Sequence, residues 1–236
     1  MHQSADSFHR PSLTDVAYRE IRNGILRGVL APGKKLVVNE LVDEWKISNT
    51  PIKEALNRLV ADELVEALPR RGMRVRIYDA AEMREIFELR ALHEVHCVRL
   101  LADAVEEQPD IAEKLRSFLA ESREVVAAGL DVEKLFSLDE AFHECIVGQC
   151  GNQTLIKSFN RLHAHSLTIG SNISRNCSLD RWRETQKEHE KVLRGILKHS
   201  PDEAEIAMRV HLEKTGAALL GFFEGSRQSG RLKKKG

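Results

Sequence analysis

Apolar side chains recur at helical spacing along most of the chain, whereas only one short stretch alternates with the period of a strand. From residue 80 onward this pattern predicts six helices, at about residues 80–105, 110–128, 132–149, 152–174, 178–199 and 202–226. Proline or glycine lies between them, for example at Pro109, Gly129 and Pro201, where helices are readily interrupted. Because strand patterns are absent here, this part is predicted to be an antiparallel bundle of helices.

The first third of the chain has a different pattern. Residues 13–29 predict an amphipathic helix, and residues 39–62 predict two short helices joined by a tight turn. Ser48 or Asn49 can cap the second short helix, and Pro51 suits its first turn because no backbone N–H is needed there. Residues 65–68 and 73–78 then predict a hairpin, which completes a winged helix-turn-helix. The core candidates of the first helix are Val16, Ile21, Ile25 and Leu26.

A polar face remains near the start of the second short helix once its apolar face is buried. Asn can pair with adenine, Lys can reach guanine or phosphate, and Thr can touch a thymine methyl group. Arginines at the tip of the hairpin can reach phosphates or the minor groove. A solvated face of a helical hairpin is the alternative, because helix pairs are common. The candidate DNA contacts are Asn39, Ser48, Asn49, Thr50, Lys53, Asn57, Arg58, Arg70, Arg71 and Gly72.

The charge distribution agrees with a DNA-binding domain attached to an acidic body. The 236 residues are 42% hydrophobic, which is enough for two domains with their own cores. Net charge is zero, but residues 1–78 carry 13 Lys and Arg against 10 Asp and Glu, residues 79–226 carry 18 against 26, and residues 227–236 carry 5 against none. We expect a disordered arm at 1–12, a DNA-binding domain at 13–78, a helical domain at 79–226 and a disordered basic tail at 227–236.

The sequence indicates neither a membrane-spanning segment nor a set of disulfide bonds. The sequence has no apolar run of membrane-spanning length and opens without a signal-peptide pattern, so we expect a cytoplasmic protein without membrane contact. Its cysteines lack CxxC spacing, which favours reduced, mostly buried thiols over a zinc ribbon or a redox motif. They are Cys97, Cys145, Cys150 and Cys177.

Four ionisable side chains fall on the apolar faces of three predicted helices. Asp139 and His143 are four residues apart on one helix, and His189 and His211 lie in line with apolar residues of two others. A buried carboxylate is costly without partners, and one Asp with three His is a suitable ligand set for Zn²⁺, Ni²⁺ or Mn²⁺. Separate, hydrogen-bonded core histidines are the alternative.

Residues 18–78 resemble the DNA-binding domain of the GntR family, through YREIRNGILRGVLAPGKKL and ELVDEWKISNTPIKEALNRLVADELVEALPRRGMRV. In that family the turn reads Ser-Arg-Thr-Pro-Val-Arg-Glu-Ala-Leu. Here Asn49 and Lys53 replace the two arginines, and Glu63 stands where a glycine commonly precedes the first wing strand. The resemblance implies a winged helix-turn-helix, and an Asn favours adenine where an Arg would favour guanine.

Residues 80–224 resemble the FCD effector domain of FadR-type GntR regulators, through FELRALHE, LDEAFHECIVGQCGNQTLI, EHEKVLRGI and AMRVHLEKT. The resemblance implies that the four residues matching the family's metal ligands hold a divalent ion, with a small carboxylate effector bound beside it. These residues are Asp139, His143, His189 and His211. It also implies that Arg90 faces the effector pocket, where Arg can bind a carboxylate with two hydrogen bonds. A structural ion pair with a glutamate is the alternative for Arg90.

These features together predict a mainly α protein that switches between two states. A dimer assembled through its helical domains would present two recognition helices to a palindromic operator in double-stranded DNA. An organic acid that coordinates the metal would favour one arrangement of the bundle and so change operator affinity. Repression relieved by the ligand is the commoner direction in the family, so we expect a repressor.

Two other classes of protein use the same residues. In a hydrolase the metal would activate water, with Glu144, Glu188 or Glu190 as general base. Each of these glutamates is next to a histidine in sequence and so points away from its face, which counts against an enzyme. In a metal sensor the ion itself would be the signal. A helical interaction module without any ligand is the remaining alternative.

Overall fold

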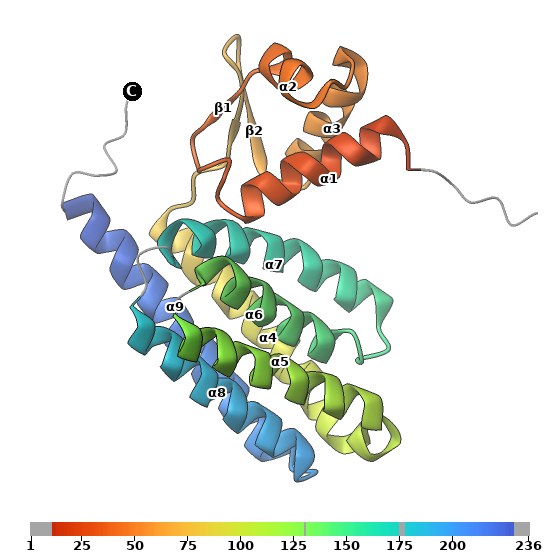
Figure 1. Cartoon of the computed structure of the whole chain (residues 1–236), viewed down its shortest axis with the longest axis vertical. Coiled ribbons are helices and arrows are strands. Elements are labelled where there is room, and N and C mark those ends of the chain that lie inside the picture. The colour runs from red at the N-terminus through yellow and green to blue at the C-terminus, as the bar shows by residue number, and fades with distance from the viewer. Residues whose placement is uncertain (1–10, 130, 175–177, 229–236) are drawn as a thin grey trace, which may run out of the picture. The chain divides into compact units, whose positions relative to one another are not determined.

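The computed structural model describes residues 11–129, 131–174 and 178–228 (Figure 1). The chain divides into two compact units, residues 1–77 and residues 78–236. Within the described ranges, no helix is long and apolar enough to cross a membrane. The predicted fold class, a winged helix-turn-helix followed by an all-α antiparallel bundle, is confirmed.

The first unit contains three helices and a small antiparallel sheet. Its helices are α1 (Leu13–Leu26), α2 (Val38–Trp45) and α3 (Asn49–Ala61), and its strands are β1 (Lys35–Leu36), β2 (Val65–Leu68) and β3 (Gly72–Val75). The strand order is β1-β3-β2, so β3 is central. The apolar faces of α1 and α3 pack together, which buries Ile21, Ile25, Ile52 and Leu56 completely. This packing leaves the opposite face of α3 at the surface.

Local details of the first unit differ from the sequence prediction. Ala17 is buried in α1 while Val16 is only partly buried. Ser48 occupies the N-cap position of α3, but its side chain makes no capping hydrogen bond. The second wing strand ends at Val75 instead of residue 78. Strand β1 was not predicted, because two residues are too short to show an alternating pattern.

Glu63, just before the first wing strand, has a backbone conformation that suits glycine. Its φ is 59°, in the left-handed region that favours glycine. The side chain of Glu63 pairs with Arg76 of the same unit at 2.9 Å. This geometry agrees with the glycine that the family resemblance implies at this position.

The second unit is a bundle of six long helices (Figure 1). Among the described residues they are α4 (Ala80–Ala104), α5 (Pro109–Ala128), α6 (Val132–Val147), α7 (Gln153–Ser174), α8 (Leu179–Leu197) and α9 (Pro201–Gln228), with a 3₁₀ turn at Val105–Glu107. Helix α4 is central, since it packs against α6, α7, α8 and α9. Helices α8 and α9 pack closely at Gly195, where a Cβ atom would lie only 2.5 Å from the Ala204 backbone nitrogen.

The structure does not describe the first ten and the last eight residues of the chain. Of the predicted arm, residues 1–10 are not described, while Ser12 caps α1 through a capping box with Asp15. Helix α9 runs to Gln228, two residues into the predicted basic tail, and residues 229–236 lie beyond the described range. Cys97 and Cys145 are buried free thiols and Cys150 is partly buried, whereas Cys177 is outside the described residues.

Candidate functional site

Four side chains from three helices of the second unit converge on one point. Asp139 and His143 come from α6, His189 from α8 and His211 from α9. Their candidate ligand atoms all lie within 4.8 Å of one another. The exposed fractions of the three histidines are 1%, 4% and 2%, and Asp139 is partly exposed. Tertiary packing thus brings the predicted ligand set together, and we call these four residues the Asp/His cluster.

The imidazole nitrogens of the cluster face one another. His211 Nε2 lies 3.2 Å from His143 Nε2 and 3.3 Å from His189 Nε2. His189 Nε2 also lies 3.5 Å from Asp139 Oδ1. A tetrahedral ion about 2.0–2.1 Å from its ligands would hold them roughly 3.3 Å apart. Three of the six pairs of candidate ligand atoms therefore lie at about the spacing that such an ion needs.

A buried carboxylate lies behind each of two histidines. Glu94 of α4 accepts a hydrogen bond from His143 Nδ1, and Glu188 of α8 accepts one from His211 Nδ1 at 2.9 Å. Because an ionised carboxylate can only accept, both Nδ1 atoms carry the proton, and in a neutral ring Nε2 carries an unshared electron pair. The electron pairs on His211 Nε2 and His143 Nε2, whose nitrogens are 3.2 Å apart, repel each other, and a cation bound between them would remove this repulsion. The residues present therefore fit a divalent metal ion.

Charge and burial maintain these protonation states. Burial raises the pKa of Glu94, but the Arg90 charge and the contact with His143 outweigh it and leave the pKa below its usual range. Burial lowers the pKa of His189 well below its usual value, and the neighbouring His211 and His143 lower it further. At neutral pH His189 is therefore uncharged, and the uncharged imidazole is the form that binds metals.

A pocket lies beside the Asp/His cluster, with Asp139 in its wall. Arg90 of α4 lines the same pocket and is itself buried. Its Nε donates to Glu94 at 2.7 Å and its Nη1 donates to Ser166 Oγ at 2.7 Å. Its Nη2 has no hydrogen-bond acceptor among the residues that the structure describes. Both roles that the sequence left open for Arg90, a pocket residue and the partner of a glutamate, occur together.

Two chains of polar contacts connect the pocket wall with the cluster. Each consists of an arginine of the wall, a buried glutamate and a histidine of the cluster: Arg90–Glu94–His143 and Arg181–Glu188–His211. In the second chain Arg181 Nη1 donates to Glu188 at 3.0 Å. Each arginine is therefore linked to a candidate metal ligand by two hydrogen bonds.

Sequence reasoning missed the contacts that both glutamates make with histidines of the cluster. Glu188 was expected to point away from the face of His189. Its carboxylate accepts a hydrogen bond from His211 of the neighbouring helix α9, which the sequence did not predict. Glu94 lies four residues after Arg90, a spacing that allows an ion pair, but its contact with α6 leaves no trace in the local sequence. Each of these contacts joins two helices, so no local spacing could have identified it.

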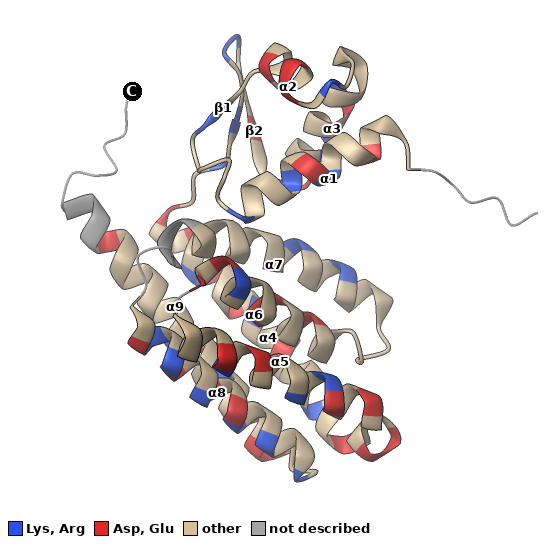
Figure 2. Ribbon diagram, in the orientation of Figure 1, with Lys and Arg blue, Asp and Glu red and all other residues tan. Residues whose placement is uncertain are grey.

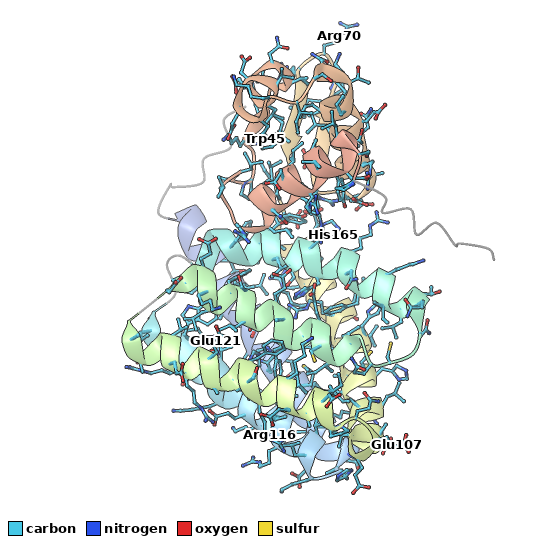
Figure 3. The ribbon with its side chains drawn as sticks, turned by 45° about the vertical axis from the view of Figure 1, so that its right-hand side comes forward. Trp45, Arg70, Glu107, Arg116, Glu121 and His165 are labelled. Atoms are coloured by element: carbon cyan, nitrogen blue, oxygen red, sulfur yellow. The ribbon has the colours of Figure 1, made fainter. Side chains whose placement is uncertain are left out.

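The candidate DNA contacts lie in the first unit, and all ten are exposed. Asn49 and Thr50 begin α3, and Lys53 follows one turn later. Arg70 and Arg71 lie in the turn between β2 and β3, where Figure 2 shows Lys and Arg gathered and Figure 3 shows Arg70 at the tip. The start of α3 and the hairpin tip are thus both available to a nucleic acid.

One of these candidates also makes contacts within the first unit. Arg58 Nη1 lies 2.7 Å from Asp15 Oδ1, and the guanidinium lies 4.3 Å from the centre of the Tyr18 ring. Both partners belong to α1. Arg58 therefore helps to hold α1 against α3, and its contact with DNA stays a prediction.

Two family models match the chain in the order of its two units. Residues 13–75 match the model of bacterial regulatory proteins of the gntR family, and residues 85–214 match the model of the FCD domain. The chain belongs to the GntR family. GntR-family proteins are transcriptional regulators that bind operator DNA, and FCD domains are known to bind metals. The Asp/His cluster is a candidate site of that kind.

Relatives of this GntR-family protein are also regulators. It is 29% identical over 201 residues to the Nta operon transcriptional regulator of Aminobacter aminovorans, a match that covers 83% of the chain and 89% of the relative. It is 27% identical over 198 residues to the HTH-type transcriptional repressor GlaR of Escherichia coli, covering 83% and 90%. The solved structure of E. coli McbR/YncC has the same fold, with a TM-score of 0.81 at 19% identity over 91% of the chain and 100% of that structure.

These families and relatives are regulators and not enzymes, as the sequence predicted. The hydrolase alternative is therefore set aside. The orientation of Glu188 agrees with this, because its carboxylate is occupied by Arg181 and His211.

Proposed function

We propose that this GntR-family regulator is a homodimeric repressor whose helical unit binds a divalent metal ion and a small carboxylic acid. The convergence of Asp139, His143, His189 and His211 carries the proposal. The pocket beside them, with the unpaired N–H of Arg90 in its wall, supplies a place for the acid. Binding of the acid releases the protein from its operator.

Zinc is the ion that we propose for the Asp/His cluster, with nickel or manganese as alternatives. Three imidazole nitrogens and one carboxylate oxygen suit all three ions. When bound, the ion supplies a positive charge and a coordination position for the carboxylate of an acid. The protein holds the histidine rings in place, through Glu94 behind His143 and Glu188 behind His211.

Arg90 is the proposed effector-binding residue. Its Nη2 can donate a charge-assisted hydrogen bond, which is stronger than one between neutral groups. The same guanidinium binds Glu94, which in turn binds His143. Acid and metal should therefore change each other's affinity, and by linkage they must do so by the same factor.

Helix α3 is the proposed recognition helix. Asn49, Lys53 and Asn57 are exposed on it, at spacings that place them along the face that would enter a major groove. Arg70 and Arg71 at the hairpin tip would contact phosphates or the minor groove. Asn49, where the family has an arginine, favours adenine at the base that it contacts, whereas Lys53 can still reach guanine or phosphate.

Exposed apolar side chains on two adjacent helices support a homodimer of helical units. Helices α4 and α9 pack against each other. The exposed residues are Leu89, Leu92 and Leu100 of α4 and Ile206 and Val210 of α9. Burial of such a patch against a second copy is favourable, and the resulting two-fold symmetry requires a palindromic operator.

Metal analysis of protein purified without chelator tests the metal site. We expect about one equivalent of metal per chain in the wild type and its loss in His189→Ala. His199→Ala is the matched control, because His199 is 38% exposed and pairs with Glu106 away from the cluster. A wild-type protein that carries no metal and cannot be loaded would contradict the proposal.

The effector role is tested on the zinc-loaded protein. Small carboxylic acids are screened by thermal shift, and DNA affinity is measured on a duplex that the protein selects from random sequences. We expect an acid that raises the melting temperature to weaken binding to this duplex. An acid that binds without changing DNA affinity would argue against the switch.

A further inference from the structure

The pocket beside the Asp/His cluster has a mixed wall. Asp139 and the two arginines supply charge at the wall. Apolar side chains make up much of the rest, namely Phe87, Phe136, Leu167, Trp182, Ala218 and Leu219. A ligand here would meet polar groups on one part of its surface and hydrocarbon on another.

Two buried N–H groups of the pocket wall lack an acceptor within the described part of the chain. They are Arg90 Nη2 and Trp182 Nε1. Buried donors are almost always hydrogen-bonded in native proteins, because an unpaired one has lost its contact with water. Two unpaired donors in one pocket therefore indicate where acceptor atoms of a ligand are bound.

Several other polar groups of the wall already make hydrogen bonds within the protein. Arg181 donates from its Nη atoms to Glu188, at 3.0 and 3.3 Å, and to Thr215 at 3.0 Å. Thr185 donates to the Arg181 backbone carbonyl at 3.1 Å, and Ser166 accepts from Arg90. These hydrogen bonds reduce the number of wall groups open to a ligand with many hydroxyls or a second carboxylate, and burial of such polar groups without partners is unfavourable.

We propose that the effector is a monocarboxylic acid with an aromatic or branched apolar body and one further acceptor oxygen. Its carboxylate accepts from Arg90 Nη2, its second oxygen accepts from Trp182 Nε1, and its body packs on the apolar wall. Dicarboxylates and sugar acids should bind less tightly, because fewer polar groups of the wall are open to them. This inference rests on the proposed function, which places a small acid in this pocket.

Four probe acids distinguish the classes by isothermal titration of the full-length, zinc-loaded protein. Phenyllactate has the proposed features, 3-phenylpropanoate lacks the second oxygen, gluconate is polyhydroxylated and succinate is a dicarboxylate. We expect phenyllactate to bind at least about tenfold more tightly than gluconate or succinate. Tighter binding of gluconate or succinate would overturn the proposed class and leave the ligand-responsive regulator intact. Absence of binding by all four acids would overturn both.

Trp182→Phe tests the indole N–H directly, because it keeps an aromatic ring in the wall. We expect the preference for phenyllactate over 3-phenylpropanoate to fall from several-fold to about one in this variant. Trp45→Phe is the matched control, since Trp45 lies in α2 of the first unit, and it should keep the preference. An unchanged preference in Trp182→Phe would overturn the role of Trp182.

A separate observation concerns the first residue of the helical unit. Tyr78 follows directly on the winged unit and is buried, and its hydroxyl lies 2.6 Å from His165 Nδ1 of α7. Figure 3 shows His165 on this helix. The next residue, Ser166, accepts the hydrogen bond from Arg90 in the pocket wall. Helix α7 thus connects the pocket to the point where the chain enters the helical unit.

We infer that the Tyr78–His165 hydrogen bond transmits occupancy of the pocket to the winged unit, which rests on the proposed function. The experiment measures how much the most tightly bound probe acid changes affinity for the selected duplex. We expect a change in the wild type within the 5–150-fold range usual for allosteric coupling, and less than about twofold in Tyr78→Phe and His165→Leu.

Ser158→Ala is the control for this second inference. It removes another hydrogen bond between α7 and α4, that of Ser158 with His93 at 3.1 Å, and should keep the wild-type response. A full response in Tyr78→Phe would overturn the relay alone. A wild type whose DNA affinity no acid changes would overturn the relay and the proposed switch together.

Discussion

Replacing Glu188 by Gln should weaken metal binding without changing any candidate ligand. Glu188 Oε2 accepts from His211 Nδ1 at 2.9 Å, and Oε1 accepts from Arg181 at 3.0 Å. Burial opposes ionisation of Glu188, but the hydrogen bonds from His211 and Arg181 lower its pKa to about 2, so the carboxylate is charged at neutral pH. An amide has one accepting oxygen, and its NH₂ group would face a donor.

The magnitude follows from what the carboxylate does for His211. It sets the tautomer with Nε2 free, orients the ring and increases the basicity of Nε2. Loss of such a partner typically costs about 10–100-fold in metal affinity, or roughly 1.4–2.7 kcal/mol. We therefore expect the zinc dissociation constant of Glu188→Gln to rise by about 10–100-fold.

Competition with a chromophoric zinc chelator at constant pH measures this effect. Glu190→Gln is the matched control: the change in charge is the same, but Glu190 pairs with Arg123 at the surface, at 2.8 Å. Circular dichroism of the metal-free variants checks that both remain folded. A Glu188→Gln protein that binds zinc within twofold of the control would refute the reasoning, because His211 would then not depend on its carboxylate.

Three further predictions concern other parts of the chain. Glu94→Gln removes the buried counter-ion of an arginine and should lower the free energy of unfolding by about 3–5 kcal/mol, measured by urea denaturation. Gly195→Ala should destabilise by about 1–3 kcal/mol because the new Cβ meets the α9 backbone, whereas Gly221→Ala, which meets nothing within 4 Å, should stabilise by about 0.5–1 kcal/mol in the same assay. Lys53→Ala should weaken binding to all DNA sequences and reduce the slope of affinity against salt by about one, while Arg58→Ala, which removes a charge already paired with Asp15, should change both less in fluorescence anisotropy titrations.

The secondary structure was largely predictable because it depends on local spacing. The six helices of the second unit begin and end within a few residues of the predicted bounds, where proline and glycine interrupt the apolar pattern. The two-residue strand β1 was missed, because its pairing with β3 is a contact between distant residues and its own length carries no period.

The Asp/His cluster was predictable only in part. Each histidine stood out because an imidazole on an apolar helical face is unusual, and the relation of Asp139 to His143 is a local one. The carboxylates behind the rings were not identified, since Glu94 and Glu188 meet histidines of other helices. The contacts of Arg58 were not predicted for the same reason: its partners Asp15 and Tyr18 lie more than 35 residues away in sequence, on α1.

The sequence by itself determined the helical periods, the order of the two units and the chemical types of the candidate ligands. These properties follow from side chains a few residues apart, whose relative directions are set by the helix itself. Only the tertiary structure decided that the Nε2 atoms of the three histidines face one another. It also decided that Arg90 Nη2 has no acceptor among the described residues, and which side chains line the pocket. Those features depend on how several helices pack, because a contact between helices is set by their relative position and not by spacing along either one.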